Sequence, residues 1–212
     1  MRIISGAARG RRLKELTGLD IRPTSDMIKE SIFNIVQFDI EGRRVLDLFA
    51  GTGQLGIEAL SRGARNAVFV DSNPDATKLI KQNLKLCDFF DFATVQTRDA
   101  LKYLDGGSHM FAQYGENRVR DGRGGRAALG NRQAREAFDL IFMDPPYDTP
   151  LAAEALSRII RIDKLNTNGI IICELKADAQ TPTVDPPYFL HKEYKYGSTK
   201  ILRYDRWESK VV

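Results

Sequence analysis

The sequence contains few of the residues on which disulfide frameworks and zinc sites are built. Its 212 residues include two cysteines, two histidines and one tryptophan. Cys87 and Cys173 lie in apolar stretches and are not spaced as metal ligands. We therefore expect two reduced thiols in the core, as is usual in the cytoplasm. With so few histidines we also expect no metal site.

The sequence also lacks a long hydrophobic run. No stretch approaches the roughly 18 apolar residues that predict a membrane span, and the first residues contain no apolar signal-peptide core. These absences predict a cytoplasmic protein with no membrane partner. A hydrophobic content of 42% is sufficient for one well-packed core.

Basic charge is concentrated in two segments. The formal net charge is +4, but residues 1–22 and residues 106–135 each carry six basic and two acidic side chains. The rest of the chain therefore has an acidic balance. Basic segments on an acidic body favour nucleic-acid binding, although ordinary solvated loops can have the same composition.

Residues 106–135 form the least regular part of the sequence. They include seven glycines and six arginines, no lysine, and little hydrophobic periodicity. We interpret them as a flexible insertion rather than as part of the folded core. Two interpretations of this segment are equally compatible with the sequence: a loop that contacts RNA, and an insertion that is simply solvated.

The remaining chain alternates between buried-strand and helix patterns. Strands are expected at 44–49, 66–70, 92–96, 138–143 and 169–175, and helices at 54–62, 74–87 and 151–162. Another helix is expected to begin at Thr24 or Ser25, and residues 188–196 and 200–207 predict a closing antiparallel hairpin. This alternation predicts an α/β protein with a mainly parallel sheet.

The first 22 residues predict a small basic β-hairpin arm ahead of a domain that spans residues 23–212. Arg9, Arg11 and Arg12 lie near the expected turn. In that position we expect them to contact phosphates, which would position a nucleic acid without reading its sequence.

The strand at 138–143 ends in the most informative motif, Asp144-Pro145-Pro146-Tyr147. Ligands of open α/β sheets bind at the carboxyl ends of the strands. The Asp144 carboxylate and the Pro145 carbonyl can accept both hydrogens of an exocyclic amine, which directs the nitrogen lone pair toward an electrophile. The prolines stiffen the loop, and the Tyr147 ring can stack on a base. A proline-rich turn without chemistry is the alternative.

A second motif follows the strand at 44–49. The sequence from Gly51 to Gly56 matches the dinucleotide-binding fingerprint, but Asp47 would disfavour a pyrophosphate beside it. An acid there suits the amino group or sulfonium of S-adenosylmethionine, or it caps a turn. Asp71 is placed to bind ribose hydroxyls. Asp99 either accepts from an adenine amino group or caps the next helix.

These motifs together resemble the class I S-adenosylmethionine-dependent amino-methyltransferases. A closer resemblance, to the bacterial 16S ribosomal RNA (guanine-N2)-methyltransferases, extends over nearly the whole chain. The motifs that carry it are Met1–Gly6 with Arg9–Leu13, Arg22–Asp26 with Ile32–Asn34, and Val45–Gly53 with Glu58–Ala64. The sequence departs from that family in the 106–135 insertion and in Asp71-Ser72, where a glutamate-lysine pair is expected.

The resemblance implies a Rossmann-like, seven-stranded, mostly parallel sheet with a carboxyl-terminal antiparallel hairpin. It implies direct in-line methyl transfer from S-adenosylmethionine to N2 of an unstacked guanine in 16S ribosomal RNA or a small-subunit particle. Separately from the resemblance, we expect a monomer. The implied catalytic residues are Asp144, Pro145, Pro146 and Tyr147. The implied cofactor-binding residues are Asp47, Phe49, Ala50, Gly51, Thr52, Gly53, Asp71, Ser72, Asp99 and Ala100. The implied RNA-binding residues are Arg9, Arg11, Arg12, Arg22 and Thr24, and no metal ligand is implied.

Three other functions use similar features. DNA adenine-N6 methyltransferases share the Asp/Asn-Pro-Pro-Tyr/Phe loop but normally carry a separate target-recognition region. A non-catalytic RNA-binding or ribosome-assembly module could retain the same fold. A nicotinamide-dependent dehydrogenase would share the glycine-rich turn.

Overall fold

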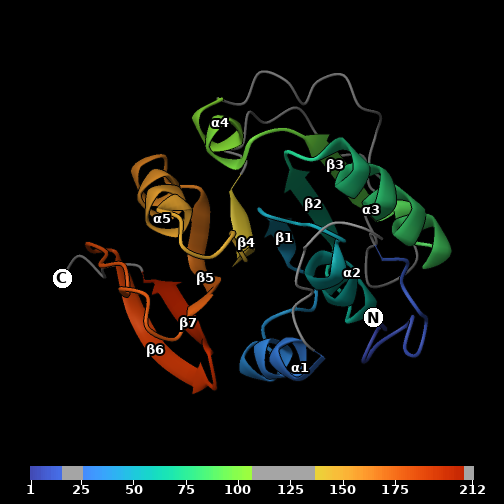
Figure 1. Ribbon diagram of the computed structural model, residues 1–212, viewed down its shortest axis with the longest axis horizontal. Coiled ribbons are helices and arrows are strands. Elements are labelled where there is room, and N and C mark those ends of the chain that lie inside the picture. Colours follow the sequence, from blue (N-terminus) through green and yellow to red (C-terminus); the bar gives the residue numbers. More distant parts are fainter. Residues whose placement is uncertain (16–25, 107–136, 208–212) are drawn as a thin grey trace.

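The computed structural model describes residues 1–15, 26–106 and 137–207 (Figure 1). The helices are α1 (Asp26–Ile35), α2 (Gln54–Ser61), α3 (Pro74–Leu86), α4 (Ala100–Asp105) and α5 (Leu151–Arg161), with a 3-10 turn η1 (Phe90–Phe92). The strands are β1 (Arg44–Asp47), β2 (Asn66–Asp71), β3 (Ala93–Thr97), β4 (Phe138–Met143), β5 (Leu165–Lys176), β6 (Tyr188–Tyr196) and β7 (Thr199–Arg206). None of the helices in these ranges is long and apolar enough to cross a membrane.

The described strands form one seven-stranded sheet in the order β3-β2-β1-β4-β5-β7-β6. The neighbours from β3 to β5 are parallel, and β7 is antiparallel to both β5 and β6. The expected parallel sheet with a closing antiparallel hairpin is confirmed. The chain builds outward from β1 to β3 and then returns to place β4 on the other side of β1. Ligands of such sheets bind at this reversal, beyond the carboxyl ends of the strands.

Helices cover both faces of the sheet (Figure 1). One hydrophobic cluster joins the sheet to α1, α2 and α3, and the other joins it to α4 and α5. Leu140 and Phe142 of β4 belong to the first cluster, whereas Ile141 and Met143 belong to the second. A strand buried on both faces has the continuous apolar pattern seen in β4.

Residues 1–15 pack against the body of the protein. A single antiparallel bridge pairs Arg2 with Arg12, in place of the regular β-hairpin that the sequence predicts. Ile3, Ala8 and Leu13 are buried in the same cluster as α2 and α3. The described part of the expected arm is therefore in direct contact with the core.

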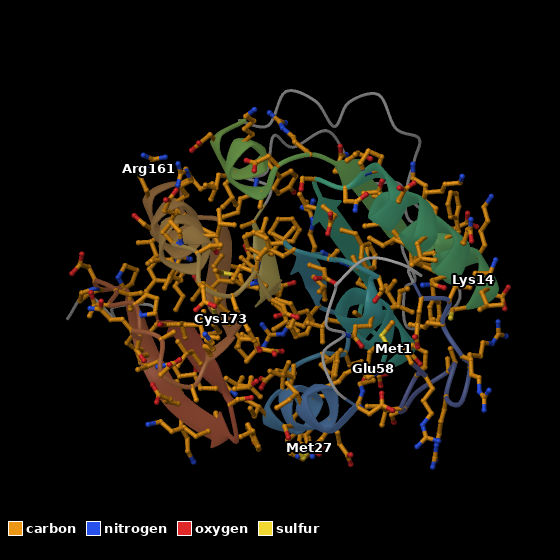
Figure 2. The ribbon with its side chains drawn as sticks, in the orientation of Figure 1. Met1, Lys14, Met27, Glu58, Arg161 and Cys173 are labelled. Atoms are coloured by element: carbon orange, nitrogen blue, oxygen red, sulfur yellow. The ribbon has the colours of Figure 1, made fainter. Side chains whose placement is uncertain are left out.

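The amino-terminal segment is held by side chains of α2 (Figure 2). The Glu58 carboxylate accepts hydrogen bonds from the N–H groups of Ile4 and Ser5, at 2.8 and 3.0 Å. The Ser61 hydroxyl accepts from the Ala8 N–H and donates to the Ser5 carbonyl, at 3.0 and 2.6 Å. Polar groups of the segment are thus satisfied where it crosses the helix.

Asn83 of α3 connects this segment to the loop after β1. Its side-chain oxygen accepts from the Lys14 N–H at 2.9 Å. Its amide nitrogen donates to the carbonyls of Lys14 and Thr52, both at 3.2 Å. Asn83 is fully buried, so these bonds are not exchanged for bonds to water.

Some boundaries differ from those expected. Strand β1 ends at Asp47, two residues early, and β5 begins at Leu165, four residues early. The expected cap at Thr24 or Ser25, and all of the 106–135 insertion except Gly106, lie outside the described residues. The division of the chain into residues 1–22 and 23–212 stays a prediction.

Candidate active site

A cavity of about 550 Å³ lies at the carboxyl ends of β1 and β4. It is bounded by the loop after β1, the end of β2, the start of α4, the loop after β4, and residues of α1, α2, α5, β5 and β7. The lining residues that the sequence predicts are Asp47, Phe49, Ala50, Gly51, Thr52, Asp71, Ser72, Asp99, Ala100, Asp144, Pro145, Pro146 and Tyr147. The structure thus gathers both predicted motifs into one cavity.

The glycine turn connects β1 to α2. Gly51 has a φ of +51° and Gly53 a φ of +78°, a backbone region that favours glycine. A side-chain carbon on Gly51 would meet no atom within 4 Å, so a ligand can approach the backbone closely there. Gly53, also predicted to bind the cofactor, is the N-cap residue of α2 and is not among the lining residues, so its contact with a cofactor stays a prediction.

Asp47 is the acid at the end of β1. It is 2% exposed, and its carboxylate accepts a hydrogen bond of 2.9 Å from the N–H of Gly56 in α2. Loss of solvation is the main cause that raises the pKa of Asp47 to about 7. The hydrogen bond from Gly56 opposes this change, and the charges of Asp144 and Asp71 contribute to it. A buried acid with this pKa is well placed to receive a cationic group, and that role stays a prediction.

Asp71 and Asp99 support the walls of the cavity. The Asp71 carboxylate accepts from the N–H groups of Gly51 and Asn73, both at 2.8 Å, and so fixes the glycine turn against β2. Asp99 caps α4 by accepting from the Lys102 N–H at 2.9 Å. The capping alternative for Asp99 is therefore observed, and its contact with adenine stays a prediction, as does the contact of Asp71 with ribose.

The loop after β4 presents its residues at different depths. Pro145 is buried, Pro146 is exposed, and Asp144 and Tyr147 are half-buried. The Tyr147 hydroxyl donates to Glu174 at 2.8 Å and lies 3.2 Å from the Thr199 hydroxyl. Desolvation is the main cause that raises the pKa of Tyr147 to about 12, so this hydroxyl remains protonated at neutral pH. The orientation of the ring is thus fixed from β5 and β7.

Several lining residues were not predicted from the sequence, and the most polar are Gln54, Glu174 and Thr199. Gln54 is 6% exposed, and its amide oxygen has no hydrogen-bond partner within the described ranges. Two of these residues had a signal in the sequence. Gln54 stands directly after the glycine turn, and Glu174 is the single acid in the apolar run of β5. Thr199 has no comparable signal, because its position depends on the pairing of β5 with β7.

The cavity fits a nucleoside ligand with a cationic end. The acids Asp47, Asp71 and Asp99 lie along it, and the buried acceptor of Gln54 lacks a donor from the described protein. A buried acceptor left without a donor costs about 1–3 kcal/mol, which a bound amino group would recover. Glycine at position 51 leaves the backbone accessible.

The arginines predicted to bind RNA lie outside the lining of this cavity. Arg9, Arg11 and Arg12 are exposed on the amino-terminal segment. Arg11 forms a 2.9 Å ion pair with Asp88 and also donates to the Leu86 carbonyl. Arg22 and Thr24, the other predicted RNA contacts, lie outside the described residues.

Comparison with known proteins identifies the family. The putative rRNA methyltransferase YlbH of Bacillus subtilis is 34% identical over 97% of this chain and 99% of its own. Ribosomal RNA small subunit methyltransferase D of Haemophilus influenzae is 32% identical over 96% of this chain and 93% of its own. The solved structure of the putative methyltransferase yhhF from Escherichia coli has a TM-score of 0.77 at 26% identity, with 99% of each chain covered.

These similarities extend over nearly the whole length of the chain. They confirm the class I methyltransferase fold expected from the sequence. The family model described as "Conserved hypothetical protein 95" matches residues 1–114 and 109–205. The chain therefore belongs to this family.

Proposed function

We propose that this protein methylates the exocyclic N2 of a guanine in small-subunit (16S) ribosomal RNA, using S-adenosylmethionine. The observation that carries the proposal is the shared cavity, which is lined both by the glycine turn after β1 and by Asp144–Tyr147 after β4. Full-length relatives named as ribosomal RNA methyltransferases support it. The enzyme acts in the cytoplasm as a monomer, on RNA or on a small-subunit particle.

The cofactor half of the cavity comprises the residues around the glycine turn. Asp47 and the Gln54 amide oxygen would receive the cationic end, Asp71 the ribose hydroxyls, and Asp99 the adenine amino group. Backbone atoms of Gly51, together with Phe49, Ala50, Thr52, Ser72 and Ala100, would complete the contact surface. S-adenosylmethionine supplies a methyl carbon activated by its sulfonium for direct in-line displacement.

The substrate half comprises the loop after β4. The Asp144 carboxylate and the Pro145 carbonyl accept the two N2 hydrogens of guanine, and the Tyr147 ring stacks on the base. The guanine must leave its helical stack to enter this cavity. Positioning of this kind contributes about 7–11 kcal/mol to catalysis. No strong base is required, because the amine releases its proton after it has become cationic.

The direct test is methyl transfer from isotopically labelled S-adenosylmethionine to small-subunit RNA and particles, with mass mapping of the modified nucleosides. We expect labelled N2-methylguanosine at one position, and the same position unmethylated in cells that lack the protein. Label found in DNA adenine and absent from ribosomal RNA would contradict the proposal and favour the DNA methyltransferase alternative.

We further propose that residues 1–22 bind the phosphate backbone of the RNA. Replacing Arg9, Arg11 and Arg12 with alanine is expected to weaken RNA binding and to reduce the slope of log affinity against log salt by about 2. A reduction of 2 rather than 3 is expected because Arg11 is already paired with Asp88. Binding titrations between 50 and 200 mM salt measure this slope.

A control for the arm is Arg161→Ala on α5, which lies at the opposite side of the molecule (Figure 2). This variant removes an exposed arginine that is bound to Asp105. We expect its salt slope to equal that of the parent protein. Equal slopes for the triple variant and the parent would show that the arm does not bind phosphate.

Cofactor affinity is expected to depend on pH through Asp47. Because folding raises the pKa of Asp47 from 3.8 to about 7, the free protein holds a proton there that the unfolded chain has already lost above pH 4. A cationic ligand prefers the carboxylate, so its binding expels this proton at pH values below about 7. We expect affinity for S-adenosylmethionine to rise about tenfold from pH 6 to pH 8.

Calorimetric titration in buffers of different ionisation enthalpy measures both the affinity and the proton release. The matched control is Asp47→Asn, which retains an oxygen to accept from Gly56 but cannot ionise. We expect weaker binding and loss of the pH dependence in this variant. The same pH dependence in both proteins would exclude Asp47 as its source.

A further inference from the structure

A buried acid, Glu174, lies in the wall of the cavity, in addition to the residues assigned above. It is 5% exposed and lies between Cys173 and Leu175, which are both buried. Buried acids that line a ligand cavity are concentrated at functional sites.

Glu174 is close to the residue that holds the amine. Met143 of β4 is paired with Cys173 of β5 in parallel register. The next residues along are Asp144, directly after β4, and Glu174, within β5. Neighbouring strands are about 4.8 Å apart. Burial is the main cause that raises the pKa of Cys173, and the negative charges of Asp144 and Glu174 both add to the change, which is consistent with this proximity.

Tyr147, which is proposed to stack on the base, is hydrogen-bonded to Glu174. The Tyr147 hydroxyl donates to one oxygen of the Glu174 carboxylate at 2.8 Å. Each carboxylate oxygen has two lone pairs, so a carboxylate can accept from Tyr147 and from further donors at the same time. The ring of Tyr147 and the carboxylate of Glu174 are thus held as one unit in the substrate half of the cavity.

The Watson–Crick edge of guanine matches this arrangement. It presents two neighbouring donors, the N2 amino group and the N1–H. Adenine presents an amino group beside N1, whose lone pair is an acceptor. The 2-amino group of guanine lies between N1 and N3, and selection at N1 requires that N1 is the atom turned toward β5 when Asp144 and Pro145 hold N2. A carboxylate there attracts an N1–H and repels an N1 lone pair.

We propose that Glu174 selects guanine by accepting a hydrogen bond from its N1–H. This inference rests on the proposed function, since it concerns the base whose N2 is methylated. Tyr147 orients the carboxylate by donating to one of its oxygens, and Thr199 lies within hydrogen-bond distance of the same hydroxyl.

The test uses small-subunit RNA in which 2-aminopurine replaces the target guanine. This base retains the 2-amino group, has an acceptor lone pair at N1 in place of N1–H, and lacks O6. The change in selectivity caused by Glu174→Gln, rather than the parent selectivity alone, therefore reports on N1. We expect the parent protein to methylate guanine at least about 100-fold faster than 2-aminopurine in kcat/KM, because sites built around a hydrogen bond reject analogues that lack it. In Glu174→Gln, whose amide can donate to N1, this ratio should fall at least tenfold.

Asp148→Asn is the matched control. It neutralises an exposed acid that pairs with Lys176 outside the cavity lining, and it should leave the guanine-to-2-aminopurine ratio unchanged. Fluorescence of 2-aminopurine supplies a readout independent of methyl transfer, since unstacking of the base on binding increases its emission. Glu174→Gln should bind the 2-aminopurine RNA more tightly than the parent does.

The outcomes separate this inference from the proposed function. If the parent protein methylates neither base, the proposed function fails. If it methylates guanine and Glu174→Gln slows both bases equally, the function stands and Glu174 is structural only. Should Glu174→Gln fail to bind cofactor in calorimetry, its affinity for the 2-aminopurine RNA decides: tighter binding than that of the parent supports the inference, and equal or weaker binding overturns it.

Discussion

Replacing Asp144 with alanine is expected to lower the rate of methyl transfer by about 10²- to 10³-fold, while affinity for the cofactor stays nearly intact. The change removes one of the two acceptors for the target amine, and loss of one preorganised hydrogen-bond partner has effects of this size in other enzymes. Asp144 is half-buried in the loop after β4, so the substitution leaves the core unchanged. Single-turnover rates at saturating cofactor, with calorimetry for cofactor binding, measure the two effects separately.

Two further variants of the same loop calibrate this result. Asp144→Asn retains one acceptor oxygen without the charge, and we expect a loss of activity smaller than that of alanine. Asp148→Ala removes an exposed acid that pairs with Lys176 at 2.9 Å, and we expect a change of less than threefold. An Asp144→Ala protein that transfers methyl groups at the parent rate would refute the proposed mechanism.

Replacing Glu58 with alanine is expected to destabilise the fold by about 3–5 kcal/mol, the usual loss when one partner of a buried charge pair is removed. The Glu58 side chain is fully buried on α2, and it receives three donors: the N–H groups of Ile4 and Ser5 and the Arg62 guanidinium at 2.9 Å. Burial lowers the pKa of nearby Lys29, whereas the charge of Glu58 raises it. Alanine would remove the carboxylate that accepts from the N–H groups of Ile4 and Ser5 and pairs with Arg62.

Urea unfolding of Glu58→Ala and the parent measures this difference in free energy. Glu154→Ala on α5 is a suitable control, because Glu154 forms an exposed i,i+4 pair with Arg158 and should contribute less than 1 kcal/mol. Glu58→Gln should be intermediate, since it retains one acceptor. A loss below 1 kcal/mol for Glu58→Ala would show that the attachment of residues 1–15 contributes little to stability.

The sheet could be predicted from the sequence because its strands have distinct hydrophobic patterns. Strand β4 is a short apolar run bounded by a charge and prolines, and the closing hairpin is marked by Gly197-Ser198 between two alternating segments. The start of β5 was missed because residues 166–168, Asn-Thr-Asn, look like a loop. Their place in a strand depends on pairing with neighbours, which local sequence does not specify.

The site was predicted where its residues are adjacent in sequence. Both motifs at strand ends were identified, and the structure places them in one cavity. Glu174 and Thr199 were missed, because Tyr147 meets them only through the order of β4, β5 and β7 in the sheet. The amino-terminal segment was expected to be an appendage, since basic residues obscure the spacing of Ile3, Ala8 and Leu13, which pack into the core.

The side-chain amide of Asn83 couples the amino-terminal segment to the glycine turn after β1. It bonds the backbone of Lys14, beside the exposed arginines, and also the carbonyl of Thr52 in the glycine turn. A ligand that moves or stiffens either backbone alters the strength of the bond to the other. Linkage is reciprocal, so whatever the nucleic acid adds to cofactor affinity, the cofactor adds to nucleic-acid affinity by the same factor.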